Sequence, residues 1–136
     1  MRNGSGTGRQ GYYLLSVLIV DDSALIRRLL RSAIEENRAL YVCGEAENGK
    51  AAVEKVIELR PDRVILDLQM PVMNGLEAAR QISKLTPGTV MSMYTMHLSE
   101  QLLKDAQAAG IQEVFSKTDG GPNRLLAWLS SASVRR

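Results

Sequence analysis

The chain of 136 residues is 45% hydrophobic and 24% charged, which fits one globular domain large enough to bury a core. It has no apolar stretch near the roughly 20 residues of a membrane span and no apolar signal core, so we expect a cytoplasmic protein without membrane contact. Its charge of +2 comes from four tail arginines (Arg2, Arg9, Arg135 and Arg136), and the 13 remaining basic residues face 15 acidic ones, which excludes a basic stripe for direct nucleic-acid binding.

The Gly-rich opening, residues 1–12, is typical of a disordered lead-in. One domain is expected over residues 13–133, followed by a tail at 134–136. Five apolar runs of strand length follow one another in this domain, at residues 16–21, 40–46, 63–67, 89–95 and 113–117. The only cysteine, Cys43, excludes an internal disulfide and a cysteine-based zinc site.

Helical patterns separate these runs. The first helix follows Ser23, a suitable N-cap. Its inward face is predicted from apolar side chains at the i, i+3, i+4, i+7, i+8 spacing, which are Ile26, Leu29, Leu30, Ala33 and Ile34. Its outward, solvated face is predicted to carry Arg27, Arg28, Arg31 and Glu35.

The remaining helices are bounded by residues that break or start a helix. The second covers about residues 49–59, before Pro61, and the third covers about 76–85, before Pro87. The fourth ends near Gly110. The fifth begins in "GGPNRLLAWLSS", with a proline in its first turn.

Strands and helices that alternate with short connections predict a parallel sheet, because each parallel crossover needs a helix. The expected fold class is therefore doubly wound α/β, with helices on both faces of the sheet. Four of the runs end on a polar side chain, and these are Asp21, Asp67, Thr95 and Lys117. We expect them to gather at the carboxyl edge of the sheet, where open α/β sheets bind ligands.

The carboxylates of Asp21, Asp22 and Asp67 would bring three negative charges together, and these repel one another unless one is protonated or a cation intervenes. A divalent ion with Lys117 would balance them, and oxygen ligands without a His or Cys cluster favour Mg²⁺. Beside such an ion, Asp67 is placed to attack a phosphorus atom and become an aspartyl phosphate. Lys117 and the Thr95 hydroxyl would stabilise the phosphoryl oxygens.

Four motifs in this order, "LIVDDS", "VILDLQMPVMNG", "YTMH" and "VFSK", resemble the receiver domain of two-component response regulators from about Val17 to Leu129. The resemblance implies a flavodoxin-like fold of five parallel strands, in the order 2-1-3-4-5, with five helices. It implies a signalling switch that is phosphorylated in a Mg²⁺-dependent reaction and then changes its partner-binding surface. The implied donor is a sensor histidine kinase or a histidine phosphotransfer protein, and the family also allows a homodimer.

The resemblance implies roles for the matching residues. The implied metal ligands are Asp21, Asp22, Asp67 and the main-chain carbonyl of Gln69, with Asp22 more direct than Asp21. Asp67 is then the phosphate acceptor, Thr95 is the hydroxyl that moves on phosphorylation, and Lys117 holds the phosphate. Pro71 and Gly75 shape the loop after the acceptor. "YTMH" and the "KTD" ending look most like the subgroup whose receivers precede a helix-turn-helix DNA-binding domain.

Three positions depart from the family pattern. An aromatic residue often stands three places before the lysine, but here that residue is Val114, and Phe115 lies one place along, on the opposite strand face. A cis proline often follows the lysine, whereas this chain has Thr118, for which a cis bond would cost roughly 3 to 4 kcal/mol. The residue after the threonine is often small, yet here it is Met96, followed by a histidine that is expected to be exposed.

Two other functions remain open. The first is a degenerate receiver that acts only as an unphosphorylated protein-binding module, which predicts the loss of an acidic residue or of the lysine. The second is a phosphatase that turns over through an aspartyl phosphate, which needs a general acid where this chain has Gln69. Neither pattern is met, so we expect a protein that catalyses only its own phosphorylation and dephosphorylation.

Overall fold

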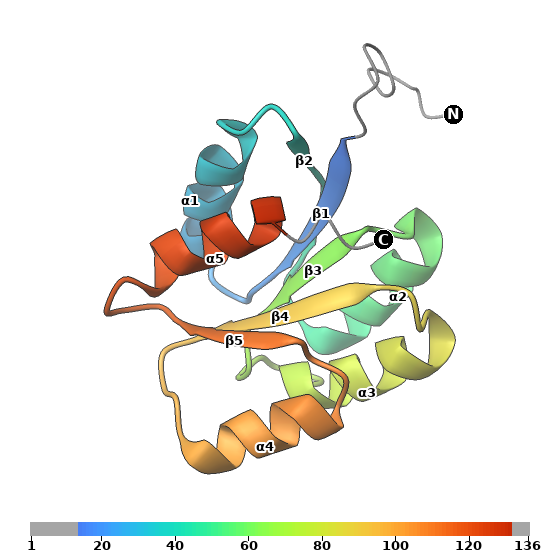
Figure 1. The fold of residues 1–136 in the computed structure, drawn as a ribbon. Helices are drawn as coiled ribbons and strands as arrows, with labels where there is room; N and C mark the ends of the chain where they lie inside the picture. The colour runs from blue at the N-terminus through green and yellow to red at the C-terminus, as the bar shows by residue number, and fades with distance from the viewer. Residues whose placement is uncertain (1–13, 132–136) are drawn as a thin grey trace.

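The structure is a computed structural model that describes residues 14–131. Strands and helices alternate along these residues (Figure 1). The strands are β1 (Leu15–Val20), β2 (Leu40–Ala46), β3 (Arg63–Leu66), β4 (Val90–Thr95) and β5 (Glu113–Ser116). The helices are α1 (Ala24–Glu35), α2 (Gly49–Leu59), α3 (Gly75–Leu85), α4 (Glu100–Ala108) and α5 (Gly121–Ser131). Every strand and helix predicted from the sequence is present, with ends shifted by one or two residues, while the predicted lead-in, tail and domain limits lie outside the described residues.

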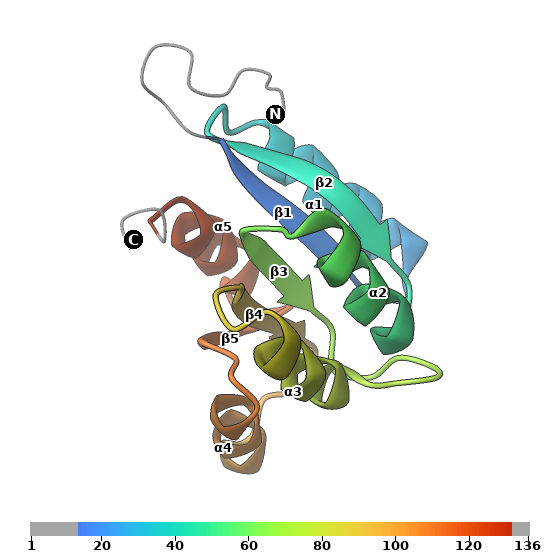
Figure 2. The same ribbon diagram turned by 90° about the vertical axis from the view of Figure 1, so that its right-hand side faces the viewer.

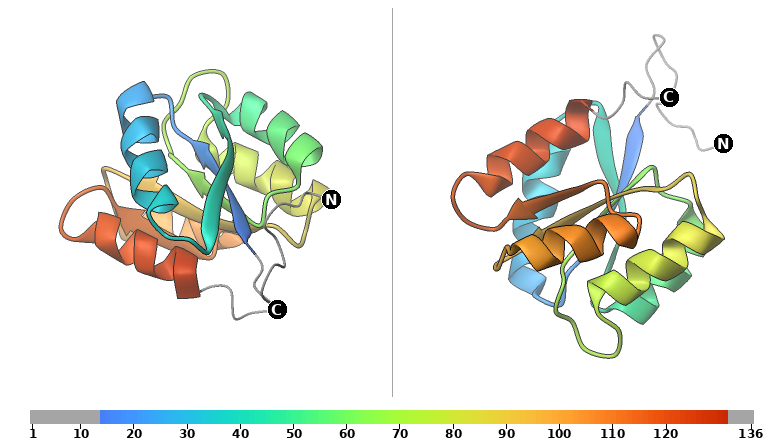
Figure 3. Two further views of the ribbon diagram at one scale, coloured as in Figure 1. Left: turned by 90° about the horizontal axis from the view of Figure 1, so that it is seen from above. Right: turned by 60° about the horizontal axis from the view of Figure 1, so that its bottom comes forward.

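The five strands form one parallel sheet in the order β2-β1-β3-β4-β5, which confirms the doubly wound, flavodoxin-like α/β fold. Figure 2 and the left view of Figure 3 show α1 on one face of the sheet and α2 and α3 on the other. α5 lies beside α1, and α4 lies beside α3 (Figures 1 and 3). The carboxyl ends of β1 and β3 are level, because Val20 pairs with Leu66. β4 runs two residues past this level, since Leu66 pairs with Met93 and β4 ends at Thr95.

A hydrophobic core fills each side of the sheet. Under α1 and α5 it contains strand residues such as Val17, Ile19, Ile65, Tyr94 and Phe115. Under α2, α3 and α4 it contains strand residues such as Leu18, Val20, Val64, Leu66 and Met93. Successive strand residues point to opposite faces, and both faces are covered, which explains why the strands are continuous apolar runs in the sequence.

The predicted inward face of α1 is wrong at Leu29. Leu30 and Ile34 are 6% and 0% exposed, whereas Leu29 is 57% exposed. Leu25, one turn earlier, is also exposed, so the two leucines form an apolar strip on the solvent side of α1. The helical period predicts the direction of the buried face, but it does not predict how wide a stripe the sheet covers.

Side-chain caps explain where four of the helices begin. Ser23, Asn48, Asn74 and Ser99 each accept a hydrogen bond from the main-chain N–H three residues later, which satisfies a donor that the helix leaves unpaired. The Ser23 cap confirms the prediction for α1. No helix within residues 14–131 has the length and apolar character needed to cross a bilayer.

Candidate functional site

The four polar residues predicted to meet at the carboxyl edge of the sheet do come together there. Asp21, Asp67 and Lys117 directly follow β1, β3 and β5, and Thr95 is the last residue of β4. The Lys117 ammonium donates a hydrogen bond to Asp21 Oδ2 at 2.8 Å and lies 3.5 Å from Asp67 Oδ1. Lys117, from the last strand, therefore joins two central strands at one charged site.

Three carboxylates make up the acidic part of the site. One oxygen from each of Asp21, Asp22 and Asp67 can be chosen so that all three lie within 4.8 Å of one another. Asp21 and Asp67 are buried, at 2% and 9% exposure, while Asp22 is open to solvent. Each of the two buried carboxylates accepts a main-chain hydrogen bond. The Ser23 N–H donates to Asp21 Oδ1, and the Leu68 N–H donates to Asp67 Oδ1.

The charges at the site shift the pKa of both Asp67 and Lys117. Burial raises the pKa of Asp67, and the nearby Asp21 charge raises it further, while Lys117 and the Leu68 N–H act in the opposite direction. Burial lowers the pKa of Lys117, but its hydrogen bond with Asp21 and the two carboxylate charges outweigh burial, so this pKa lies above its ordinary value. Lys117 is therefore a cation at neutral pH, while burial and the Asp21 charge disfavour the ionised form of Asp67.

The donor set fits a hard divalent cation. All three side chains offer carboxylate oxygens, the ligands that Mg²⁺ prefers. The Lys117 ammonium reaches two of these three carboxylates, and a divalent cation would balance the remaining negative charge. Gln69, the fourth predicted ligand, follows Asp67 in the β3–α3 loop, where its side chain is exposed.

The loop after Asp67 is held tightly at both ends. The Gly75 N–H donates to the Leu68 carbonyl at 2.8 Å, and the Gly49 N–H at the start of α2 donates to the Met73 carbonyl at 2.9 Å. A Cβ on Gly75 would collide with the carbonyl oxygen of Asp67, so only glycine lets α3 start this close to Asp67. The resemblance assigned Gly75 to shaping this loop, and the contact agrees.

Val72 adopts a backbone conformation that is unusual for a β-branched residue. Its φ is +71°, in the left-handed region, and the Met73 N–H donates across it to the Pro71 carbonyl at 2.7 Å, as in a strained γ-turn. The Val72 side chain is 76% exposed, so it gains little from packing. The turn therefore carries strain that its side chain does not offset.

We expect Val72→Asn to stabilise the protein by about 1 kcal/mol, because asparagine tolerates positive φ and the exposed valine loses little buried area. Urea unfolding of both proteins measures the difference. Val72→Ile is the matched control, since it keeps the branched Cβ and should unfold as the wild type does. An unchanged midpoint for Val72→Asn would show that the turn is unstrained.

The predicted solvated face of α1 is wrong at Arg27, while Arg31 remains partly exposed. The Arg27 side chain is only 18% exposed and shares the carboxylate of Glu45, on β2, with Arg31, at 2.9 and 2.8 Å. Arg27 also donates to the main-chain carbonyl of Asp21 at 2.8 Å, so it ties α1 and β2 to the first acidic residue of the site. The sequence did contain a signal for these ion pairs, because Glu45 is an acidic residue within an otherwise apolar strand and α1 is rich in arginine.

The three departures from the family pattern have structural counterparts. Val114 packs against the core under α2, α3 and α4, and Phe115 packs on the other face, with its ring centroid 5.9 Å from that of Trp128. The Lys117–Thr118 bond is trans, as are all peptide bonds among the described residues. Met96 is 54% exposed beside the buried Thr95.

Comparisons with known proteins agree with this arrangement. Residues 17–129 match the family model described as "Response regulator receiver domain". The "Chemotaxis protein CheY" of Thermotoga maritima is 38% identical over 118 residues, which cover 86% of this chain and 96% of that protein. The CheX-CheY-BeF3-Mg²⁺ complex from Borrelia burgdorferi contains a similar fold, with a TM-score of 0.81 at 27% identity over 93% of both chains.

A longer protein also matches in part. A "Protein-glutamate methylesterase/protein-glutamine glutaminase" of Pyrococcus abyssi is 43% identical over 107 residues, which cover 77% of this chain but 28% of that protein. The chain thus spans less than a third of that relative, and the relative's named activity does not transfer with the match. The comparisons do not decide whether a helix-turn-helix domain follows, so that subgroup stays a prediction. From the family match over most of its length, the chain belongs to the response regulator receiver domains.

Proposed function

We propose that the protein is a phosphorylation-dependent signalling switch whose acceptor is Asp67. The observation that carries the proposal is the meeting of the Asp67 carboxylate with Asp21, Asp22 and Lys117 at one edge of the sheet. The donor in this proposal is a sensor histidine kinase or a histidine phosphotransfer protein in the cytoplasm. We also propose that the domain extends from residue 13 to residue 133. The same proposal allows the protein to form a homodimer.

The proposed chemistry is an in-line displacement at phosphorus. An Asp67 oxygen attacks the phosphorus of the phosphohistidine, the O–P bond forms as the P–N bond breaks, and the electron pair leaves with the imidazole nitrogen. Asp21, Asp22, Asp67 and the Gln69 carbonyl would hold Mg²⁺, which would supply positive charge to offset the phosphoryl and carboxylate oxygens. Lys117 binds a phosphoryl oxygen as a cation, and the Thr95 hydroxyl donates to another.

The two alternative functions lack support. A degenerate receiver would have lost an acidic residue or the lysine, and all of them are present at the site. A phosphatase would need a general acid two residues after Asp67, where Gln69 stands. We therefore propose that catalysis is limited to the protein's own phosphorylation and dephosphorylation.

Intact-mass measurement after incubation with Mg²⁺ and acetyl phosphate tests this function. We expect a single added phosphate that is absent when Mg²⁺ is chelated. No mass change with Mg²⁺ present would favour the degenerate receiver. Sustained hydrolysis of a phosphate monoester, without any phosphorylated protein accumulating, would favour the phosphatase.

Met96 is expected to limit access to the acceptor. Its side chain follows Thr95 and extends into solvent at the end of β4, where both a small donor and the water for hydrolysis must approach in line. Met96→Ala should therefore speed phosphorylation by acetyl phosphate and shorten the lifetime of the phosphorylated form. The control is Leu98→Ala, which truncates an exposed side chain of the same loop. Rates within about twofold of wild type, or roughly 0.4 kcal/mol, would rule out a gate.

A further inference from the structure

Besides Asp21 and Asp67, the Lys117 ammonium contacts the aromatic ring of Tyr94, which has no assigned role in metal binding or phosphorylation. The ammonium lies over the ring of Tyr94, 5.8 Å from the ring centroid, within the range of a cation–π interaction. We propose that Tyr94 is a positioning residue for phosphoryl transfer, because its ring face holds the Lys117 ammonium where it reaches the phosphoryl group on Asp67. This inference rests on the proposed function.

The other partners of Lys117 have competing tasks during the reaction. Asp21, at 2.8 Å, also contributes an oxygen to the acidic cluster, and Asp67, at 3.5 Å, becomes an acyl phosphate when it accepts the phosphoryl group. In the loaded site the two carboxylates would therefore attract Lys117 less strongly, and the phosphoryl oxygens would become its charged partners. The Tyr94 ring carries its negative face in every state, so it keeps its attraction for the ammonium while the other two weaken.

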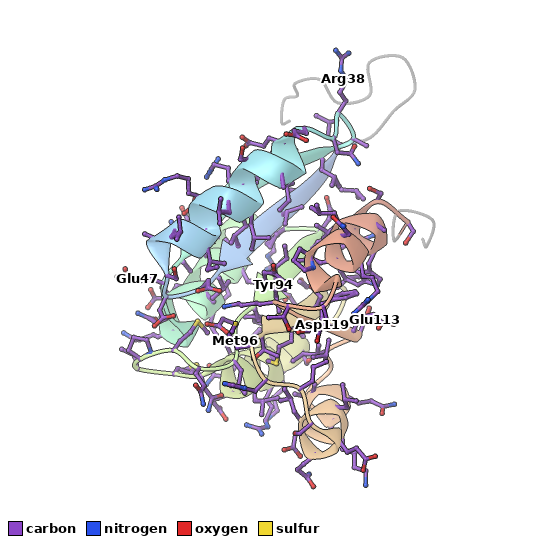
Figure 4. All side chains as sticks on the ribbon, turned by 90° about the vertical axis from the view of Figure 1, so that its left-hand side faces the viewer. Arg38, Glu47, Tyr94, Met96, Glu113 and Asp119 are labelled. Atoms are coloured by element: carbon purple, nitrogen blue, oxygen red, sulfur yellow. The ribbon has the colours of Figure 1, made fainter. Side chains whose placement is uncertain are left out.

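Tyr94 is well placed to act as a fixed support. It is 6% exposed and lies in β4, directly before Thr95, in the core under α1 and α5. Figure 4 shows Tyr94 between these two helices and Met96 beyond it. Its partner in the strand register is Phe115, whose ring packs against Trp128 of α5. A side chain buried in this core cannot swing away when the charges above it change.

Three substitutions separate the ring's action on Lys117 from its packing. Tyr94→Phe keeps the ring, Tyr94→Leu removes it, and Phe115→Leu removes a neighbouring ring of the same core, outside the cation–π contact of Lys117 with Tyr94. With acetyl phosphate and saturating Mg²⁺, we expect Tyr94→Phe and Phe115→Leu to react within about twofold of wild type. Tyr94→Leu should react about 2- to 30-fold more slowly, the range that a cation–π contact implies. Its Mg²⁺ affinity should be unchanged, since Tyr94 is not among the candidate metal ligands.

A double-mutant cycle gives the decisive comparison. In a Lys117→Ala background, Tyr94→Leu should have no further effect on the rate, because the group on which the ring acts is gone. The proposal is overturned if Tyr94→Leu slows the reaction equally in both backgrounds, if Phe115→Leu slows it as much as Tyr94→Leu, or if Tyr94→Leu matches wild type. A wild-type protein that takes up no phosphate would instead overturn the proposed function.

A spectroscopic measurement tests the contact in the wild-type protein, so the test does not depend on the folding of Tyr94→Leu. The ε-methylene protons of Lys117 should show an upfield ring-current shift in the NMR spectrum of the wild type and of Tyr94→Phe. We expect this shift to persist in the phosphorylated protein. Ordinary lysine chemical shifts in the wild type would contradict the contact.

Discussion

We expect Asp67→Asn to abolish uptake of phosphate from acetyl phosphate, because the amide that replaces the carboxylate is not a nucleophile toward phosphorus. The change is nearly isosteric, so the variant should remain folded. Intact mass and circular dichroism of the variant measure the two effects. The matched control is Asp119→Asn, which alters an exposed carboxylate with φ +53° that asparagine tolerates, and this control should be phosphorylated as the wild type is.

The same variant should be more stable than the wild type at neutral pH in the presence of a chelator. Burial and the Asp21 charge raise the pKa of Asp67 in the folded state, so the ionised carboxylate disfavours folding. For such a group the stabilising contribution is present below its unfolded pKa and is lost as the pH rises through its raised folded pKa. The gain in stability from Asp67→Asn should therefore shrink as the pH falls and Asp67 becomes protonated.

The phosphorylation experiment has its own contradicting outcome. If Ser23 or Thr95 of the Asp67→Asn variant took up phosphate at wild-type levels, the assignment of Asp67 as the acceptor would be wrong.

Gly121→Ala should destabilise the protein by at least about 3 kcal/mol, because the added methyl group meets main-chain atoms that cannot turn aside. A Cβ at Gly121 would overlap the carbonyl oxygen of Ser116 and lie 2.6 Å from its carbon. The Gly121 N–H also donates to Thr118 O at 2.9 Å, closing the turn that follows Lys117. Relief of the overlap would therefore move Lys117 away from the carboxylates.

Urea unfolding measures this effect against Gly88→Ala. A Cβ at Gly88 would have no atom within 4 Å, so that variant should lie within about 0.5 kcal/mol of wild type. A Gly121→Ala protein with the wild-type midpoint would show that α5 shifts easily relative to β5. Its phosphorylation rate, measured where it is still folded, should then also remain normal.

The order of elements followed from local sequence signals. Apolar runs of five to seven residues marked the strands, and residues such as Ser23 and Pro61 marked where helices begin or end. The candidate site followed from topology, since side chains that end parallel strands must share an edge, which placed Asp67 near Lys117 without any knowledge of their distance.

The remainder depended on three-dimensional contacts that no local pattern encodes. The period of α1 gave the same apolar signal for Leu29 and Leu30, and only packing on the sheet separates an exposed leucine from a buried one. The hydrogen bond from the Arg27 side chain to the Asp21 carbonyl depends on how α1 packs against β1. The contact of Tyr94 with Lys117 joins residues of two strands through the direction of a lysine side chain.

The ring pair of Phe115 and Trp128 gives the protein an internal optical label. Trp128 is the only tryptophan of the chain, it is half-buried on α5, and its ring lies tilted at 55° to that of Phe115. Selective excitation of indole therefore reports on α5 alone and on its packing against β5, without an added dye or labelled residue. Because indole emission depends on the polarity around the ring, the wavelength of the emission maximum reports how closely α5 packs against the sheet.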